Sequence, residues 1–132
     1  MGDIVSMNDG EYDIEHVVQN SQKSKMEIMD CIINNRLIYK KEGMNYYFAP
    51  EQFNDDGEII EAFPKILEAL QMIGVNDMNS IYRNFSVNDP DLANYNLLTY
   101  VVRNYSNDED IVSGVVHFYK NKYLWVQLVF LI

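Results

Sequence analysis

The sequence predicts a mostly α-helical single domain with a small β-hairpin over residues 36–48. Two observations predict the helices: apolar residues recur at three- and four-residue spacing, and capping residues stand where those stretches begin or end. A third predicts the hairpin, because β-branched and aromatic residues flank a short connection that contains glycine. Residues 1–11 are expected to form a flexible N-terminal segment and residues 12–132 one globular domain, since 132 residues suffice for one domain but not two.

Two helices are expected before the hairpin. The apolar positions between residues 13 and 35 mostly follow helical spacing, and the polar stretch 19–24 divides them. The hairpin then has strands at 36–39 and 44–48, joined by residues 40–43, and Pro50 ends it.

The most regular helix is predicted between residues 59 and 73. Its apolar residues share one face, and Gly74 follows at the position where glycine relieves left-handed strain. Pro64 cannot lie deep inside this helix, so the regular part is expected to begin close to it. Asn76 is then expected to cap a short helix that presents Ile81, Tyr82 and Phe85.

Asp89, Pro90 and Asp91 together form a helix-start signal, because a capping carboxylate precedes a proline at the first helical position. The helix that they are expected to begin has one apolar face, made of Leu92, Tyr95, Leu98, Val102 and Tyr105. Of these we assign Leu92, Leu98 and Val102 to the core.

The C-terminal region has two interpretations. Apolar residues at helical spacing from Ile111 and the acidic stretch 108–110 favour a helix capped by Ser106 or Asn107. The β-branched content and the polar stretch 120–122 favour an α+β fold with a C-terminal β-hairpin over residues 115–132. Either way the apolar C-terminus must be buried, in the chain's own core or in a homodimer interface.

The charge narrows the choice of partner. With 20 acids against 10 bases the net charge is −10, which argues against direct binding of nucleic acid or of an anionic membrane surface. It favours a basic protein as partner. No secretion signal or apolar stretch of membrane-spanning length occurs, and a single cysteine, Cys31, permits no internal disulfide, so we expect a cytoplasmic protein.

Residues for catalysis or metal binding are scarce. His16 and His117 are the only histidines, and no nucleophile motif or glycine-rich phosphate loop occurs. Residues 52–57 resemble half of a calcium loop, but Gln52 and Phe63 stand where that loop needs carboxylates. We therefore expect no cofactor, no metal and no enzymatic activity. The rival hypothesis is an enzyme that uses a pair of carboxylates.

A recognition face is predicted on the segment 46–61, where acids alternate with aromatic residues. Rigid aromatic side chains anchor a partner, while carboxylates steer it and pair with its Lys or Arg. The predicted partner-binding residues are Tyr46, Tyr47, Glu51, Phe53, Asp55, Asp56, Glu58 and Glu61. The alternative is that these acids are only solvated surface. Residues 11–13, Glu-Tyr-Asp, form a smaller example of the same pattern.

The middle of the chain, residues 29–85, resembles a small bacterial domain family known for a DNA-mimic protein. The resemblance depends on Asn34-Asn35, the pair Tyr47-Phe48, Asp56-Gly57, and a helix that ends at Ile73-Gly74. Arg36 and Leu37 stand where that family has two glycines. The resemblance implies a mostly helical fold whose surface carboxylates substitute for phosphates and occupy a DNA-binding protein.

The function that we predict is a non-enzymatic acidic inhibitor that binds and blocks a basic protein. The most economical version is an immunity protein that neutralises a nucleic-acid-cleaving toxin, whose cleft would be basic. One alternative is a DNA mimic that occupies a DNA-binding regulator or a defence nuclease. Another is a structural or oligomeric accessory protein.

Overall fold

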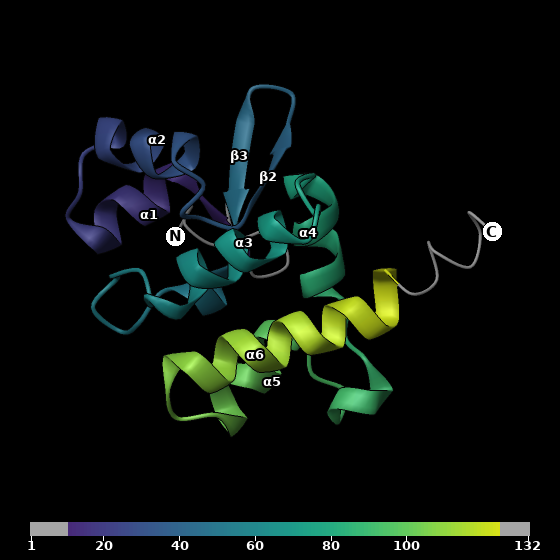
Figure 1. Ribbon diagram of the computed structural model, residues 1–132. Helices are drawn as coiled ribbons and strands as arrows, with labels where there is room; N and C mark the ends of the chain where they lie inside the picture. The colour runs from purple at the N-terminus through teal and green to yellow at the C-terminus, as the bar shows by residue number, and fades with distance from the viewer. Residues whose placement is uncertain (1–10, 125–132) are drawn as a thin grey trace.

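The computed structural model describes residues 11–124. In that part of the chain it has six α-helices and one three-stranded antiparallel sheet, which confirms a mostly helical fold with a small β element (Figure 1). The helices are α1 (Ile14–Ser21), α2 (Lys25–Ile33), α3 (Ala62–Met72), α4 (Met78–Ser86), α5 (Leu97–Asn104) and α6 (Asp108–Tyr119). The strands are β1 (Tyr12–Asp13), β2 (Tyr39–Glu42) and β3 (Asn45–Phe48), and three short turns of helix are η2 (Pro50–Gln52), η3 (Pro90–Leu92) and η4 (Lys120–Leu124).

The predicted division into two N-terminal helices is confirmed. Asp13 caps α1 by accepting a hydrogen bond from the N–H of His16. Ser24 and Glu27 form a reciprocal capping box at the start of α2, so two free N–H groups of that helix are satisfied. Between the helices Gln22 adopts φ +59°, which reverses the chain and lets α2 pack against α1.

The predicted hairpin is present, but its turn is shorter than expected. Gly43, with φ +63°, and Met44 alone connect the strands, and Lys40 and Lys41 belong to β2. A two-residue turn with positive φ at its first position matches the twist of paired strands. The sheet also gains β1 on the other edge of β3, through the pairs Tyr12↔Phe48 and Asp13↔Tyr47. A two-residue strand carries no periodicity, so the sequence could not predict it.

The helix α3 is shorter than the predicted 59–73, and it begins two residues before Pro64. It ends in the predicted way. Gly74 has φ +88°, its N–H donates to the carbonyl of Gln71, and the N–H of Val75 donates to the carbonyl of Leu70. This pair of bonds satisfies carbonyl groups that the end of the helix leaves free.

The prediction of a single helix after Asp89 is wrong. Asp89 caps only the short turn η3, because Ala93 and Asn94 have positive φ values of 56° and 67° and redirect the chain. A new helix, α5, begins after Asn96, which accepts from the N–H of Thr99. The helix α5 buries Leu97, Leu98 and Val101, and Leu92 of η3 is also buried. Val102 is 40% exposed, so its assignment to the core was wrong.

The C-terminal region is helical as far as it is described. Asn107 accepts from the N–H of Asp110, and three acids occupy the positive end of α6. Ile111, Val115 and Tyr119 are buried one turn apart, so the alternative hairpin is wrong over residues 115–124. Residues 125–132, and with them the predicted homodimer interface, lie outside the described residues.

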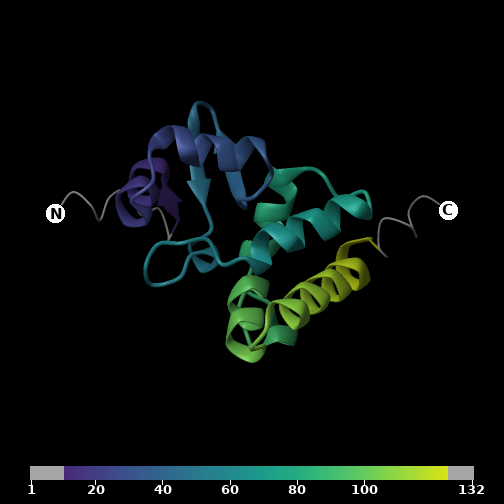
Figure 2. The same cartoon turned by 60° about the vertical axis from the view of Figure 1, so that its left-hand side comes forward.

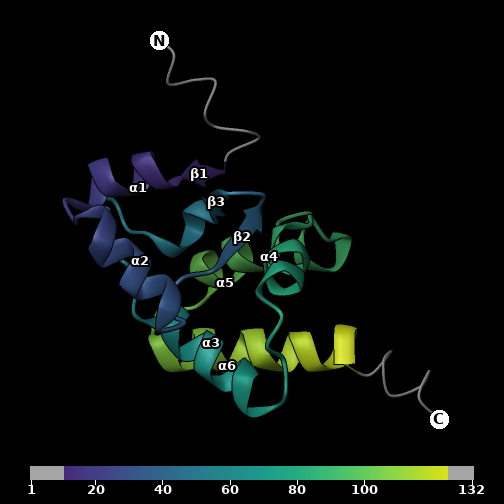
Figure 3. The same cartoon turned by 90° about the horizontal axis from the view of Figure 1, so that it is seen from above.

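Two groups of buried side chains hold the fold together. The main core joins α3, α4, α5 and α6 with Ile38 and Ala49 of the hairpin region, and α6 lies along α3 (Figure 2). The N-terminal core consists of Val17, Ile28, Ile32, Leu37 and Phe48. Seen from above, α1 and α6 lie on opposite sides of the molecule (Figure 3).

The predicted N-terminal segment 1–11 falls outside the described residues except for Glu11. The carboxylate of Glu11 accepts from the hydroxyl of Tyr82 at 2.8 Å and pairs with Lys40 at 2.7 Å. Burial, and next the bond to Glu11, raise the pKa of the Tyr82 phenol. Within residues 11–124 no helix has the length and apolar character needed to cross a membrane.

Candidate functional site

The two tyrosines of the predicted face lie on opposite faces of β3. Tyr46 packs edge-on against Tyr39, with 5.6 Å between ring centroids, and contributes to the N-terminal core. Tyr47 pairs with Lys40 across the strands, and the Lys40 ammonium lies 5.6 Å from its ring centroid. Because alternate side chains of a strand point to opposite faces, these two rings cannot form one surface.

Three of the five acids between residues 51 and 61 are engaged within the chain. Glu51 accepts from the amide of Asn96 at 3.0 Å and from the hydroxyl of Thr99 at 3.2 Å, which ties η2 to the start of α5. The other two form surface ion pairs, Glu58 with Lys23 at 3.2 Å and Glu61 with Arg36 at 3.1 Å. These carboxylates are therefore less free to receive a partner than the sequence suggested.

Asp55 and Asp56 remain, and both are exposed on the acidic loop, by which we mean residues 53–59. Within the described part of the chain, neither carboxylate makes a hydrogen bond or an ion pair. The side chain of Asn54 accepts from the N–H groups of Asp56 and Glu58 at 2.9 and 3.0 Å. A β-bridge between Phe53 and Ile59 closes the loop, so its backbone is held by its own bonds.

A cavity of about 290 Å³, here called the loop pocket, opens beside Asp55. Two aromatic rings form one part of its wall: Tyr12 and Phe53 are stacked, with 6.2 Å between centroids and 27° between planes. The remaining lining residues are Val17, Asn20, Asn54, Asp55 and Gly57. The pocket therefore joins the acidic loop to β1 and to the C-terminal part of α1.

Of the eight predicted residues, the structure brings Phe53 and Asp55 together in the loop pocket, with Asp56 beside them. Tyr12 and Asn20 were not among the eight predicted residues, and they reach the pocket from a distant part of the chain. The signal for Tyr12 was the Glu-Tyr-Asp triplet at residues 11–13. Asn20 had no signal, because its place depends on how α1 packs against the loop.

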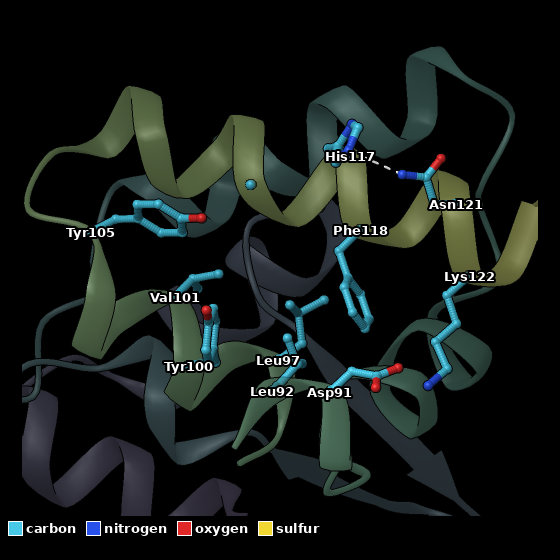
Figure 4. A pocket seen from close by; sticks show the side chains of 11 residues that line it. Asp91, Leu92, Leu97, Tyr100, Val101, Tyr105, His117, Phe118, Asn121 and Lys122 are labelled. Carbon is cyan, nitrogen blue, oxygen red and sulfur yellow. Dashed lines mark hydrogen bonds between the residues drawn. The ribbon is translucent and has the colours of Figure 1, made fainter. Parts of the chain in front are cut away.

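A larger groove of about 510 Å³ lies between α5 and α6 (Figure 4). Leu97, Val101 and Phe118 give it an apolar lining, and His117 and Lys122 stand at its rim. A ring nitrogen of His117 contacts the amide of Asn121 at 3.0 Å, and Lys122 pairs with Asp89. The side chains of His117 and Lys122 are thus engaged with neighbouring side chains.

The side chains that could carry covalent or metal chemistry are not gathered in one place within residues 11–124. Cys31 is half-buried on α2, and burial raises the pKa of its thiol, which disfavours the reactive thiolate. In the same range no group of three or more His, Cys, Asp or Glu side chains is arranged to hold a metal ion.

Comparison with known proteins adds no relative: no protein-family model, no curated protein and no solved structure matches this chain. The acidic loop and the loop pocket are therefore identified as the candidate site from their geometry alone.

Proposed function

We propose that this chain is a non-enzymatic, cytoplasmic inhibitor that binds a basic protein and blocks it. The single observation that carries the proposal is the acidic loop, where Asp55 and Asp56 are exposed on a backbone held by its own hydrogen bonds. Neither carboxylate has a partner among the described residues. Two charges on a loop whose backbone is hydrogen-bonded are already organised for a cationic partner, so less conformational entropy is lost on binding.

The net charge supports the same proposal. At −10, and with acids exposed on α2, α3 and α6 as well, the chain attracts a basic protein from a distance. Such steering raises association rates by about 10- to 1000-fold at low salt. The distributed charge brings a partner close, and the acidic loop supplies the contact.

Among basic partners we favour a nucleic-acid-cleaving toxin, which would make the chain an immunity protein. A nuclease needs a basic cleft because it must hold phosphates. A DNA mimic that occupies a DNA-binding regulator or a defence nuclease uses the same charges and is the second candidate. The two differ only in what the partner does with nucleic acid.

The test uses the protein encoded by the neighbouring gene. If that protein is basic, the purified chain should form a complex with it, and association should slow steeply between about 0.05 and 0.5 M salt. An immunity protein should also stop its partner from cleaving DNA or RNA. A complex that blocks DNA binding by a partner without cleavage activity would support the DNA mimic instead. Failure to bind the basic neighbour at low salt would overturn both.

A further inference from the structure

We infer that the loop pocket takes the guanidinium group of an arginine from the basic partner. The inference rests on the proposed function, since it names the chemical group that the acidic loop recognises. It concerns one cavity of about 290 Å³ and the residues around it. This volume lies at the lower end of the range for ligand pockets, about 300–1,000 Å³, and is sufficient for one long side chain.

The wall of the loop pocket includes a carboxylate residue. Asp55 lines the pocket, and its carboxylate makes no ion pair among the described residues. Lys23, the lysine that pairs with the same loop, contacts Glu58 at 3.2 Å. A cation that entered the pocket would therefore meet a free carboxylate.

The C-terminal end of α1 lies at the loop pocket. The last four carbonyl groups of a helix have no partner within it and carry the negative end of the helix dipole. Asn20 lies in that last turn and lines the pocket. No basic residue occupies the last turn of α1.

The aromatic pair in the wall of the pocket favours arginine over lysine. The planar guanidinium stacks on aromatic rings and presents five N–H donors, whereas the ammonium of lysine is compact and strongly hydrated. Tyr12 and Phe53 supply the rings, and the ring of Tyr12 is further supported by His16 at 4.1 Å between centroids. With Asp55 also lining the pocket, the pocket offers both a surface to stack on and a carboxylate to accept hydrogen bonds.

The experiment is a titration of the isotope-labelled full chain, followed through its backbone amide resonances by NMR. The probes are N-acetyl-arginine amide and N-acetyl-lysine amide, at millimolar concentrations and low salt. We expect the arginine probe to cause saturable shifts at the amides of Asn20, Asn54, Asp55 and Gly57. The lysine probe should bind at least about fivefold more weakly, because it cannot stack. Equal binding of both probes, or no localised shifts with either, would overturn the inference.

Two matched variants complete the design. Asp55→Asn removes the charge that lines the pocket, and Asp56→Asn removes the same charge from the next residue, which does not line it. Asp55→Asn should weaken the arginine probe by at least about fivefold and Asp56→Asn by less than about twofold. If both weaken it equally, only net charge matters and there is no arginine site. The spectra themselves report whether each variant keeps its fold.

The same variants separate this inference from the proposed function. If the complex with the basic neighbour forms and Asp55→Asn leaves its affinity unchanged, the inhibitor proposal stands and the arginine pocket falls. If the arginine probe binds as expected but no basic neighbour does, the pocket stands and the inhibitor proposal falls.

Discussion

Gly57 and Asn20 are in such close contact that only glycine fits at position 57. A Cβ added to Gly57 would lie 2.1 Å from the carbonyl oxygen of Asn20, and Gly57 has φ +81°. The acidic loop is thereby seated directly on the last turn of α1, which closes one side of the loop pocket. The shape of the candidate site therefore depends on a glycine that carries no charge.

We predict that Gly57→Ala lowers the free energy of unfolding by about 2–4 kcal/mol. The added methyl group must displace the loop from α1, and alanine is also strained at positive φ. Gly43→Ala is the matched control, because Gly43 has φ +63° but nothing within 4 Å of an added Cβ, so only about 1 kcal/mol is expected. Denaturant unfolding measures both. Equal losses would mean that the contact with Asn20 is easily relaxed.

Gln52 is predicted to be the most sensitive polar residue of the fold. It is 0% exposed, and its amide accepts from the N–H of Ile38 and donates to the carbonyls of Ile38 and Ala49. Gln52→Leu leaves the buried N–H of Ile38 without a partner, at a cost of about 2–4 kcal/mol. The carbonyls of Ile38 and Ala49 keep only long bonds, from the N–H of Ala49 at 3.4 Å and from the N–H of Gln52 at 3.5 Å. Gln71→Leu, an exposed position on α3, should change stability by less than about 0.5 kcal/mol. A small effect at Gln52 would show that water replaces its bonds.

Removal of Asp55 and Asp56 together should weaken binding to the basic partner at least about tenfold, or about 1.4 kcal/mol. The control removes equal charge at Asp30 and Glu68, which are exposed on α2 and α3 and have no partner among the described residues. Calorimetry measures the affinity of both alanine double variants for the basic partner. Equal weakening would leave net charge as the sole determinant, while a stronger effect of the control would place the contact surface elsewhere.

Stability should depend on pH through Asp89. The hydrogen bond from Lys122, and then the N–H of Asp91, lower the pKa of this carboxyl group. A carboxyl group with a lowered pKa in the folded state stabilises the fold above its ordinary pKa, and this stabilisation is lost as the pH falls through the lowered value. Asp89→Asn should therefore lower the urea midpoint most near neutral pH, and its difference from the unmodified protein should shrink below about pH 4.

The control for this pH dependence is Asp91→Asn, because the exposed side chain of Asp91 accepts no hydrogen bond among the described residues. Its urea midpoint should follow that of the unmodified protein at every pH. If the difference in urea midpoint between Asp89→Asn and the unmodified protein stays constant from about pH 7 to about pH 3, the lowered pKa of Asp89 is contradicted.

Much of the helical structure was readable from neighbouring residues. The ends of α3 and α6 depend on Gly74 and Asn107, whose backbone and side chain act within one turn of their own positions. The exposed acids of the loop were likewise predicted from composition and spacing. The prediction of the helix after Asp89 failed because its start signal is compatible with two lengths. Asp89 and Pro90 begin a helical turn, but they do not determine how many residues follow in it.

Only the tertiary structure decided which of the predicted acids are free. Glu51 is held by Asn96, Glu58 by Lys23 and Glu61 by Arg36, and each pair joins segments far apart in the chain. The same packing placed Tyr12 and Asn20 beside Asp55 and turned Val102 outward. Local propensity acts over a few bonds, whereas the pairing of a charge and the lining of a pocket depend on segments that meet only when the core is buried.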